Sequence, residues 1–273
     1  MALATPPVIE LLRKQREHAM PPIVPLRHPK FTLTANSQKI LVVIQYWAGD
    51  KPQAMRMARL MADIEPKHSD LADVLFSARF DCEHDTANVH YVARKFNMHT
   101  FRGRRREIGW PAGCNAMVFD LMAHLGEQQE ADRMPVYKAI LLTEADDAPL
   151  VRDWIAQLSA EWDRCATNMI GPLLPAPGPH PHINGNCMIS PAIQHYLRHL
   201  GGCDPHAGWD YFLAPHFKKR GWANTNKIVS RYAHPSIDEG TFNHLVASGC
   251  VLLHGTKDDS ALELSRRKIL LEK

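Results

Sequence analysis

An apolar segment that ends in three carboxylates is the feature that most constrains this chain. Residues 136–150 read V-Y-K-A-I-L-L-T-E-A-D-D-A-P-L, and residues 139–142 form a short, continuous apolar run. Such a run, bounded by acids and a proline, is typical of a buried strand in an α/β sheet whose polar end lies at the carboxyl edge. Ligands of open α/β sheets bind at that edge. The sequence therefore places Glu144, Asp146 and Asp147 together at a binding edge.

A divalent cation is the expected partner of these three side chains. Neighbouring carboxylates repel one another and raise each other's pKa unless a positive charge compensates. Hard divalent metals take oxygen ligands, and a metal held here would in turn hold a diphosphate. The residues alone leave open an alternative, a solvated strand-to-helix turn in which Asp147 caps the next helix.

Glu144-Ala-Asp146 and three further segments carry a resemblance to a known family. Residues 251–258 read V-L-L-H-G-T-K-D, residues 182–189 read H-I-N-G-N-C-M-I, and residues 109–115 read G-W-P-A-G-C-N. In that order they resemble the late H-G-x-K segment, the pocket-lining N-G-x strand and the nucleotide-side glycine turn of GT-A glycosyltransferases. Glu144-Ala-Asp146 resembles the DXD motif of that family, with Glu in the first acidic place.

The resemblance covers roughly residues 38 to 260 and implies a fold. We expect an α/β protein with a single GT-A-like domain, in which a Rossmann-like mixed central sheet is flanked by helices. On this interpretation residues 1–37 are an N-terminal extension, 38–260 the glycosyltransferase domain and 261–273 a C-terminal tail. A length of 273 residues with 45% hydrophobic content agrees with one compact domain.

The resemblance also implies the metal and the chemistry of the site. Asp146 and His254 are expected to bind the metal with help from Glu144 or Asp147. Imidazole and carboxylate together suit Mn²⁺ better than Mg²⁺. The implied reaction moves a sugar from a nucleotide diphosphate sugar, with UDP favoured, to an acceptor hydroxyl. Residues expected to bind the donor are Gln45, Tyr46, Trp47, Asp50, Trp110, Asn115 and Lys257, and those expected in the sugar and acceptor pocket are Asn184, Gly185, Asn186 and Trp209.

Two of these assignments have competing interpretations. At residues 45–50 the aromatic side chains and Asp50 suit a nucleoside, but a plain helix cap at Asp50 with packed aromatics fits equally well. Asp210, which opens a late helix, is expected beside the acceptor hydroxyl, where it removes the proton in inverting members of the family. The alternative for Asp210 is an acid stabilised by the helix dipole.

Two basic clusters bear on the acceptor. The first comprises Arg102, Arg104, Arg105 and Arg106, and the second comprises Lys218, Lys219 and Arg220. Clustered cations of this kind contact phosphates, so DNA with hydroxymethylated bases is one predicted acceptor, as for phage glycosyltransferases. Otherwise both clusters are solvated faces, and the acceptor is a carbohydrate, a lipid-linked sugar or a small molecule.

Other function classes and the cellular location follow from what the sequence lacks. A sugar-nucleotide nucleotidyltransferase would carry a G-x-G-T-R-type loop after its first strand, where this chain has residues 45–50. A non-catalytic nucleotide-sugar binding protein is the other alternative, since Glu144 departs from the usual Asp. We expect reduced cysteines, no secretory leader or membrane anchor, and a cytoplasmic reaction, bacterial or viral.

Apolar periodicity predicts the elements themselves. We expect strands at 39–45, 72–78, 97–101, 166–173 and 183–189. Helices are expected at 8–18, from Asp50 onward, at 115–125 with Gly126 as its end, at 151–162 with Trp154 and Trp162 in the core, and at 193–200 closed by Gly201.

Overall fold

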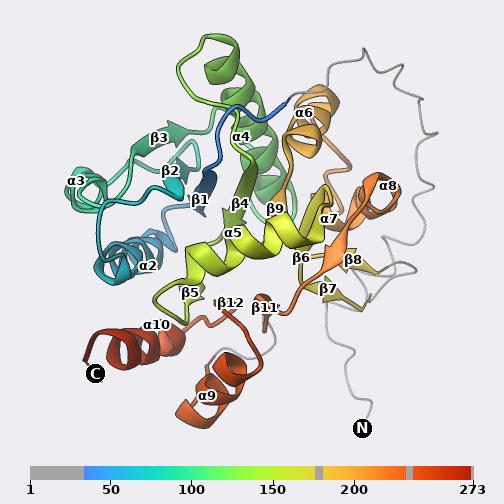
Figure 1. Ribbon diagram of the computed structural model, residues 1–273. Helices are drawn as coiled ribbons and strands as arrows, with labels where there is room; N and C mark the ends of the chain where they lie inside the picture. Colours follow the sequence, from blue (N-terminus) through green and yellow to red (C-terminus); the bar gives the residue numbers. More distant parts are fainter. Residues whose placement is uncertain (1–33, 176–180, 232–235, 272–273) are drawn as a thin grey trace, which may run out of the picture.

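The structure is a computed structural model that describes residues 34–175, 181–231 and 236–271. The predicted helix at 8–18 lies outside the described residues. Within them, a mixed sheet of seven strands in the order β10-β6-β9-β4-β1-β2-β3 forms the centre (Figure 1). Its strands are β1 (Ile40–Tyr46), β2 (Ala72–Ala78), β3 (Met98–Arg102), β4 (Ala139–Thr143), β6 (Met169–Gly171), β9 (Met188–Ile189) and β10 (Ala223–Asn224). The expected α/β class and the mixed central sheet are confirmed.

The sheet is parallel in one half and mixed in the other. β1 pairs in parallel with β2 and β4, and β2 pairs in parallel with β3. β9 lies antiparallel between β4 and β6, while β10 runs parallel to β6. The parallel strands β1, β2 and β4 therefore end at the same edge, which brings the turns that follow them together.

Helices cover both faces of the sheet, as the apolar runs require. In β1 every residue from Ile40 to Ile44 is fully buried, with Ile40 and Val42 in one core cluster and Leu41 and Val43 in the other. This burial on both faces is why the strand reads as a continuous apolar run rather than an alternating one. The first cluster includes α2 (Lys51–Ile64) and α5 (Trp154–Cys165), and the second includes α4 (Ala112–Glu130) and α6 (Pro191–Leu200).

Smaller elements complete the fold around the edge where the acids lie. A second sheet has three strands, β11 (Ile228–Ser230), β12 (Leu252–His254) and β5 (Asp147–Pro149), in that order. β12 pairs in parallel with β11 and antiparallel with β5. The remaining elements are β7 (Leu173–Leu174), β8 (His182–Ile183), α3 (Thr86–Ala93), α7 (Trp209–Phe212), α8 (Ala214–Arg220), α9 (Glu239–Ala247), α10 (Ser260–Arg266) and η1 (Arg267–Leu271). Ala261 and Leu262 of α10 are buried in the first core cluster; the domain boundary at residue 260 stays a prediction.

Several sequence expectations match the elements closely, and others need correction. Trp154 and Trp162 are core residues, as predicted, and α6 does end at Gly201, whose φ of 63° is left-handed. Gly126, however, does not end α4, which continues to Glu130. A Cβ at Gly126 would lie 2.4 Å from Nη1 of Arg198 on α6, so this glycine serves close helix packing.

The predicted strand at 183–189 is two strands. β8 and β9 are separated by a turn at residues 184–187, because the Asn-Gly-Asn sequence bends the chain between the two apolar pairs. The alternative in which Asp147 caps a helix is wrong. Asp147 is fully buried in β5, and Asp153 precedes α5 instead.

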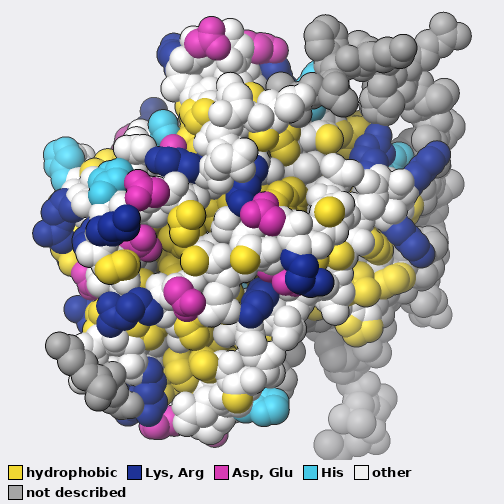
Figure 2. All heavy atoms as spheres, in the orientation of Figure 1, with side chains coloured by type: hydrophobic (Ala, Val, Ile, Leu, Met, Phe, Trp, Pro, Cys, Tyr) yellow, Lys and Arg dark blue, Asp and Glu magenta, His cyan; other side chains and the backbone are white. Residues whose placement is uncertain are grey.

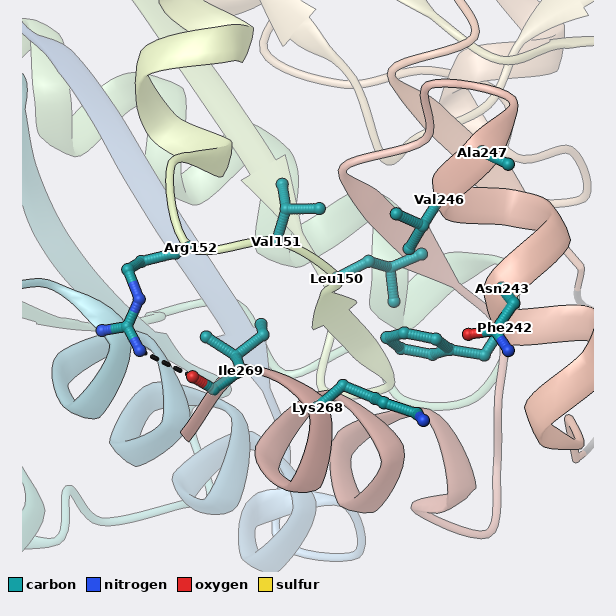
Figure 3. A pocket seen from close by; sticks show the side chains of 9 residues that line it. All are labelled: Leu150, Val151, Arg152, Phe242, Asn243, Val246, Ala247, Lys268 and Ile269. Carbon is teal, nitrogen blue, oxygen red and sulfur yellow. Dashed lines mark hydrogen bonds between the residues drawn. The ribbon is translucent and has the colours of Figure 1, made fainter. Parts of the chain in front are cut away.

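The structure contains a pocket outside the predicted site. Its volume is about 510 Å³, and it is lined by the chain after β5, by α9 and by η1 (Figure 3). At its border Arg152 donates to the carbonyl of Ile269. None of the predicted site residues lines it. No helix in the described part of the chain is long and apolar enough to cross a membrane. The six cysteines are free thiols, as expected.

Candidate active site

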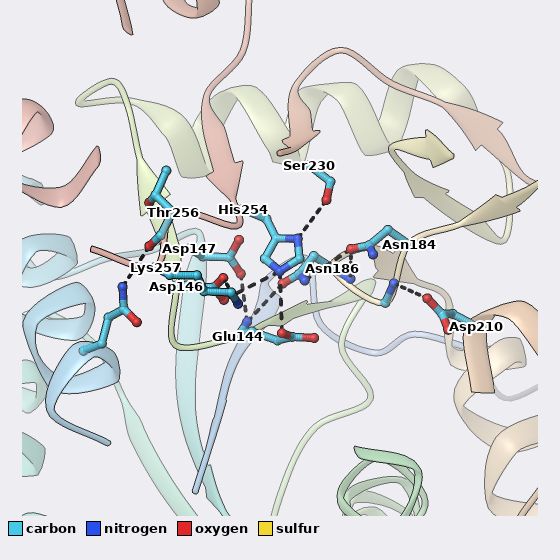
Figure 4. Close-up of polar contacts among 12 residues, drawn as sticks. Glu144, Asp146, Asp147, Asn184, Asn186, Asp210, Ser230, His254, Thr256 and Lys257 are labelled. Carbon is cyan, nitrogen blue, oxygen red and sulfur yellow. Dashed lines mark hydrogen bonds and ion pairs between the residues drawn. The ribbon is translucent and has the colours of Figure 1, made fainter. Parts of the chain in front are cut away.

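Glu144, Asp146 and His254 converge on one point at the carboxyl edge of the sheet (Figure 4). His254 Nε2 lies 3.5 Å from Glu144 Oε2 and 3.6 Å from Asp146 Oδ1. One ligand atom from each of the three residues lies within 4.8 Å of the others. They meet because β12 pairs antiparallel with β5, with His254 opposite Asp147. The two segments are more than one hundred residues apart in the sequence.

Hydrogen bonds fix the orientation of this group. Ser230 Oγ contacts His254 Nδ1 at 3.0 Å, which leaves Nε2 facing the carboxylates. The backbone N–H of Glu144 donates to Asp147 Oδ2 at 2.8 Å and to Asn186 Oδ1 at 3.0 Å. Asp147 therefore tightens the turn after β4 from inside, and its other oxygen, Oδ1, is buried without a hydrogen-bond partner among the described residues.

Electrostatics tie the three acids to two cations. Burial lowers the pKa of His254, but Glu144, Asp147 and Asp146 outweigh it and raise that pKa to about 9. For Glu144, loss of solvent raises the pKa, yet the nearby His254 and Lys257 bring it below its ordinary value. Burial holds the pKa of Asp147 well above its usual range. The raised pKa values of His254 and Lys257 show that the acids favour positive charge at this point, which a metal ion would also supply.

The residues fit a divalent metal. Two carboxylates and an imidazole nitrogen form a mixed oxygen and nitrogen donor set, and the ring is already oriented through its other nitrogen by Ser230. Asp147 Oδ1 is a further buried oxygen without a partner among the described residues, at a typical cost of about 1–3 kcal/mol. Lys257 forms an ion pair with Asp146 Oδ2 and supplies positive charge at the same place.

The turn after β1 lies within electrostatic reach of the acids. Asp50 Oδ1 accepts the Trp47 N–H at 2.8 Å and makes no side-chain cap to α2, so it closes the turn rather than capping the helix. Burial and the charges of Glu144 and Asp146 raise the pKa of Asp50 to about 6. Gln45 Nε2 is buried without a partner in the described part of the chain.

The two aromatic residues of this turn differ in what they can contact. Tyr46 is buried, and its hydroxyl meets His84 Nδ1 at 2.7 Å. Trp47 is 44% exposed, with the Arg79 guanidinium 4.9 Å from its ring. A Cβ at Gly49 would lie 2.3 Å from the Trp47 ring, so the glycine lets the indole fold over the turn. Trp47, rather than Tyr46, offers a ring face to a ligand.

Trp110 and Asn115 lie at the start of α4 but differ in exposure. Trp110 is 62% exposed. Asn115 is buried, where its amide nitrogen donates to the carbonyls of Asp204 and Ala207 and its oxygen accepts the Trp209 N–H. The amide of Asn115 therefore holds the loop before α7 in place.

The predicted acceptor pocket is joined to the acidic group through one turn. Asn184 Oδ1 accepts hydrogen bonds from the backbone N–H and the side-chain amide of Asn186. Asn186 Oδ1 in turn accepts the Glu144 N–H. Gly185 N–H donates to Asp210 Oδ2 at 2.9 Å. Trp209 is 4% exposed and packs edge-on against Phe217, so it belongs to the core. Asp210 thus lies one turn away from the predicted metal ligands.

Comparison with known proteins gives the fold. No protein-family model matches this sequence, and no curated protein matches it either. Among solved structures, the bifunctional glycosyltransferase WbbM aligns with a TM-score of 0.52 at 10% identity, over 89% of this chain and 51% of WbbM. The chain has a GT-A-like glycosyltransferase fold.

Two further glycosyltransferases align less closely with this GT-A-like chain. One, involved in glycosylation of the major capsid of PBCV-1, has a TM-score of 0.48 at 10% identity, over 85% of this chain and 98% of its own. The other is residues 1–349 of TarS from S. aureus, with a TM-score of 0.45 at 9% identity, over 68% and 58%. The chain spans about half the length of WbbM and 58% of that TarS fragment.

The first basic cluster of the GT-A-like domain is engaged within the protein. Arg102 pairs with Glu83, Arg104 pairs bidentately with Glu127, and Arg105 pairs with Asp120. Arg106 lies 6.0 Å from the ring of Phe80. These acidic partners neutralise much of the positive charge that a polyanion would meet.

The second cluster is more open. Lys218 and Lys219 in the last turn of α8 are exposed, whereas Arg220 stacks on Tyr196 at 3.8 Å. Figure 2 shows Lys and Arg interspersed with Asp and Glu over the visible face.

Sequence reasoning did not assign roles to Ser230 or His182, although the GT-A-like fold places both beside predicted site residues. Ser230 contacts His254 from β11, a three-residue strand without a periodic signal. His182 lies 4.0 Å from Asp210. Its place at the head of the H-I-N-G-N segment was the available signal, since that segment was already predicted to line the pocket.

Proposed function

We propose that this protein is a metal-dependent glycosyltransferase that moves a sugar from a nucleotide diphosphate sugar, UDP-linked by preference, to an acceptor hydroxyl. One observation carries the proposal: Glu144, Asp146 and His254 converge beside Lys257 at the carboxyl edge of a GT-A-like sheet. Glu144, Asp146 and His254 would hold Mn²⁺ or Mg²⁺, with Mn²⁺ favoured by the imidazole ligand. When bound, such a cation stabilises the negative charge of a leaving diphosphate.

The chain's own residues supply the remaining steps. Lys257 is half-exposed and carries its charge next to the acids, where it would offset charge on the diphosphate. Trp47 and Trp110 present exposed rings for the nucleoside. Asp210 orients the acceptor hydroxyl and, if configuration is inverted, takes its proton as the acceptor oxygen bonds to the anomeric carbon.

The two basic clusters bear on the choice of acceptor. DNA with hydroxymethylated bases remains one candidate because Lys218 and Lys219 are exposed. The pairing of Arg102, Arg104 and Arg105 with acids favours a carbohydrate or small-molecule acceptor. Cytoplasmic location and the absence of a membrane anchor stay predictions.

Calorimetry with nucleoside diphosphates in the presence and absence of Mn²⁺ tests the donor half of the proposal. We expect metal-dependent binding, strongest for UDP. Incubation with several sugar nucleotides and acceptors, hydroxymethylated DNA included, followed by mass spectrometry then identifies the product. Metal-independent or absent binding of every nucleoside diphosphate would contradict the proposal and favour a binding protein of another kind.

A further inference from the structure

Asp210 is anchored on both carboxylate oxygens yet open to solvent on one side. Oδ1 accepts the Tyr211 N–H and Oδ2 accepts the Gly185 N–H, each at 2.9 Å. The Asp210 side chain is 18% exposed to solvent. A carboxylate in this state is held in one orientation and can still meet an acceptor.

His182 is a buried neighbour of Asp210, and its Nε2 faces the Asp210 carboxylate. The ring is 10% exposed and Nε2 is 4.0 Å from Asp210 Oδ2, which is too long for a direct hydrogen bond. The Tyr211 ring meets it edge-on, with centroids 5.5 Å apart at 89°. Nδ1 is buried without a partner among the residues that the structure describes.

The unpartnered Nδ1 argues against a purely structural role. Buried polar atoms in folded proteins are nearly always hydrogen-bonded, and leaving one unpaired costs about 1–3 kcal/mol. An apolar ring would pack against Tyr211 without that cost. A polar ring is therefore not needed here for packing. The charged group that the His182 ring faces, through Nε2, is Asp210.

The other titratable groups near Asp210 leave His182 as the one that favours its charged form. Burial raises the pKa of Asp210, as does the Glu144 carboxylate, whereas His182 and the hydrogen bonds from the Tyr211 and Gly185 N–H groups lower it. The thiols of Cys114, Cys187 and Cys203 also lie within electrostatic reach from other elements. Burial raises the pKa of each thiol, to about 11 for Cys114 and about 12 for Cys203, so they are uncharged at neutral pH.

We infer that His182 is a positioning residue for Asp210: its buried ring packs on Tyr211, whose N–H holds Oδ1, and turns Nε2 toward Oδ2, so that the carboxylate faces the acceptor hydroxyl. The inference rests on the proposed transfer. In that step the acceptor O–H proton goes to Asp210, the acceptor oxygen bonds to the anomeric carbon, and the bond from that carbon to the diphosphate oxygen breaks, with its electron pair leaving on the diphosphate. His182 itself forms and breaks no bond.

The test compares His182→Phe and His182→Gln with the wild type. Phe keeps the ring shape, while Gln keeps polarity without an imidazole. The Asp210 carboxyl carbon is followed by NMR against pH in aspartate-labelled protein, with Asp210→Asn for assignment. The control is His124→Phe. His124 lies on α4, outside the proposed site, and its ring stacks on that of Phe101 with centroids 4.2 Å apart.

In both His182 variants we expect the Asp210 titration to move to higher pH by about one unit, and kcat at pH 6 to fall by about two- to tenfold as less of the carboxylate is ionised. UDP affinity with Mn²⁺ should stay within about twofold, because His182 acts on the acceptor side. An unchanged Asp210 titration in folded variants overturns the inference. If the wild type transfers no sugar from any donor, the proposed function fails, while the titration still decides what His182 does to Asp210.

Discussion

Asp146 holds two partners at once, one on each carboxylate oxygen. Oδ1 faces His254 at 3.6 Å, and Oδ2 pairs with Lys257. Asp146→Asn keeps the size of the side chain but removes its charge. We expect it to reduce Mn²⁺-dependent UDP binding by at least about tenfold, because a charged oxygen ligand is lost. Calorimetry with UDP and Mn²⁺ measures the change.

A matched control separates this effect from instability. Asp70 is 80% exposed before β2, at the opposite edge of the sheet, and pairs with Lys67 there. Asp70→Asn should bind UDP and Mn²⁺ as the wild type does. Wild-type metal dependence in Asp146→Asn would remove Asp146 from the proposed ligand set.

Lys257 yields a prediction with opposite signs in two measurements. Its ammonium occupies Asp146 in the absence of metal, so it competes with a cation for that oxygen. Lys257→Met keeps the aliphatic stem and removes the charge. We expect Mn²⁺ alone to bind about fivefold more tightly, as for loss of a half-exposed ion pair of about 1 kcal/mol. UDP in the presence of Mn²⁺ should bind more weakly.

Both halves are measured on the same protein, the first by calorimetry with Mn²⁺ alone and the second with UDP added. Lys67→Met is the control, since Lys67 is 76% exposed and pairs with Asp70 instead. Weaker Mn²⁺ binding in Lys257→Met would mean that Lys257 does not compete with the metal.

At the residue scale, the sequence predicted the acids and not their supports. Glu144 and Asp146 follow an apolar run, so their shared position at a sheet edge follows from local pattern. His254 came from the family resemblance alone. Ser230 and Asn186 orient the group through pairing of β11 with β12 and through the turn between β8 and β9. Such contacts depend on tertiary structure, which single-sequence periodicity does not encode.

At the element scale, Glu161 joins α5 to the segment that leads from β10 to β11. Its carboxylate accepts a bidentate pair of bonds from Arg164 and a 2.7 Å bond from the Thr225 hydroxyl. The hydrogen bond from Arg164 is the largest of the effects that lower the pKa of Glu161 to about 2, whereas burial acts in the opposite direction. The side chain is 8% exposed, so the contribution to stability is of the order of 2 kcal/mol.

The direction of this pKa shift determines the pH range in which Glu161 stabilises the protein. Because the folded pKa lies below the ordinary value of 4.5, this stabilisation is complete above pH 4.5 and is lost as pH falls toward 2. Glu161→Gln should therefore lower the free energy of unfolding at pH 6, with a difference from wild type that shrinks by pH 3. Urea unfolding at both pH values checks it. A constant difference would contradict the assignment, and Glu130→Gln, at an exposed pair with Arg198, is the control.

Element boundaries were predictable where packing is simple. β2 matches its predicted range of 72–78 because a parallel strand buried on both faces reads as one apolar run. α4 extends beyond its predicted end because Gly126 serves contact with Arg198, and a local rule reads such a glycine as a stop. Strands of two or three residues, such as β5 and β12, carry too few residues for any periodicity.

At the scale of the whole molecule, the site depends on long-range pairing. Parallel β1 and β4 end at one edge, which sets the Trp47–Asp50 turn near the acids, and β12 then adds His254 from the far end of the sequence. The GT-A-like fold was predictable because these turns fall in the order of the family's motifs. Their exact contacts were not, because the small β11-β12-β5 sheet assembles only in the folded chain.

The distribution of charge over the molecule decides whether DNA is a credible acceptor. The chain carries 32 Lys and Arg against 29 Asp and Glu, and Arg102, Arg104 and Arg105 already face acids. Exposed Lys218 and Lys219 remain the better phosphate contacts. If DNA binds, its affinity should fall steeply with salt, because each neutralised phosphate contributes about −0.9 to the slope of log affinity against log salt.

Replacing both Lys218 and Lys219 by Ala should then flatten that slope by about 2, whereas Arg104→Ala, which breaks a pair with Glu127, should change it little. Fluorescence anisotropy with duplex and single-stranded DNA across a salt series measures both. Equal slopes for the wild type and the double variant would exclude this face as a DNA contact. If the wild type does not associate with DNA even at low salt, the acceptor is not DNA. The proposed sugar transfer would survive that result, because the proposal rests on Glu144, Asp146 and His254 and not on surface charge.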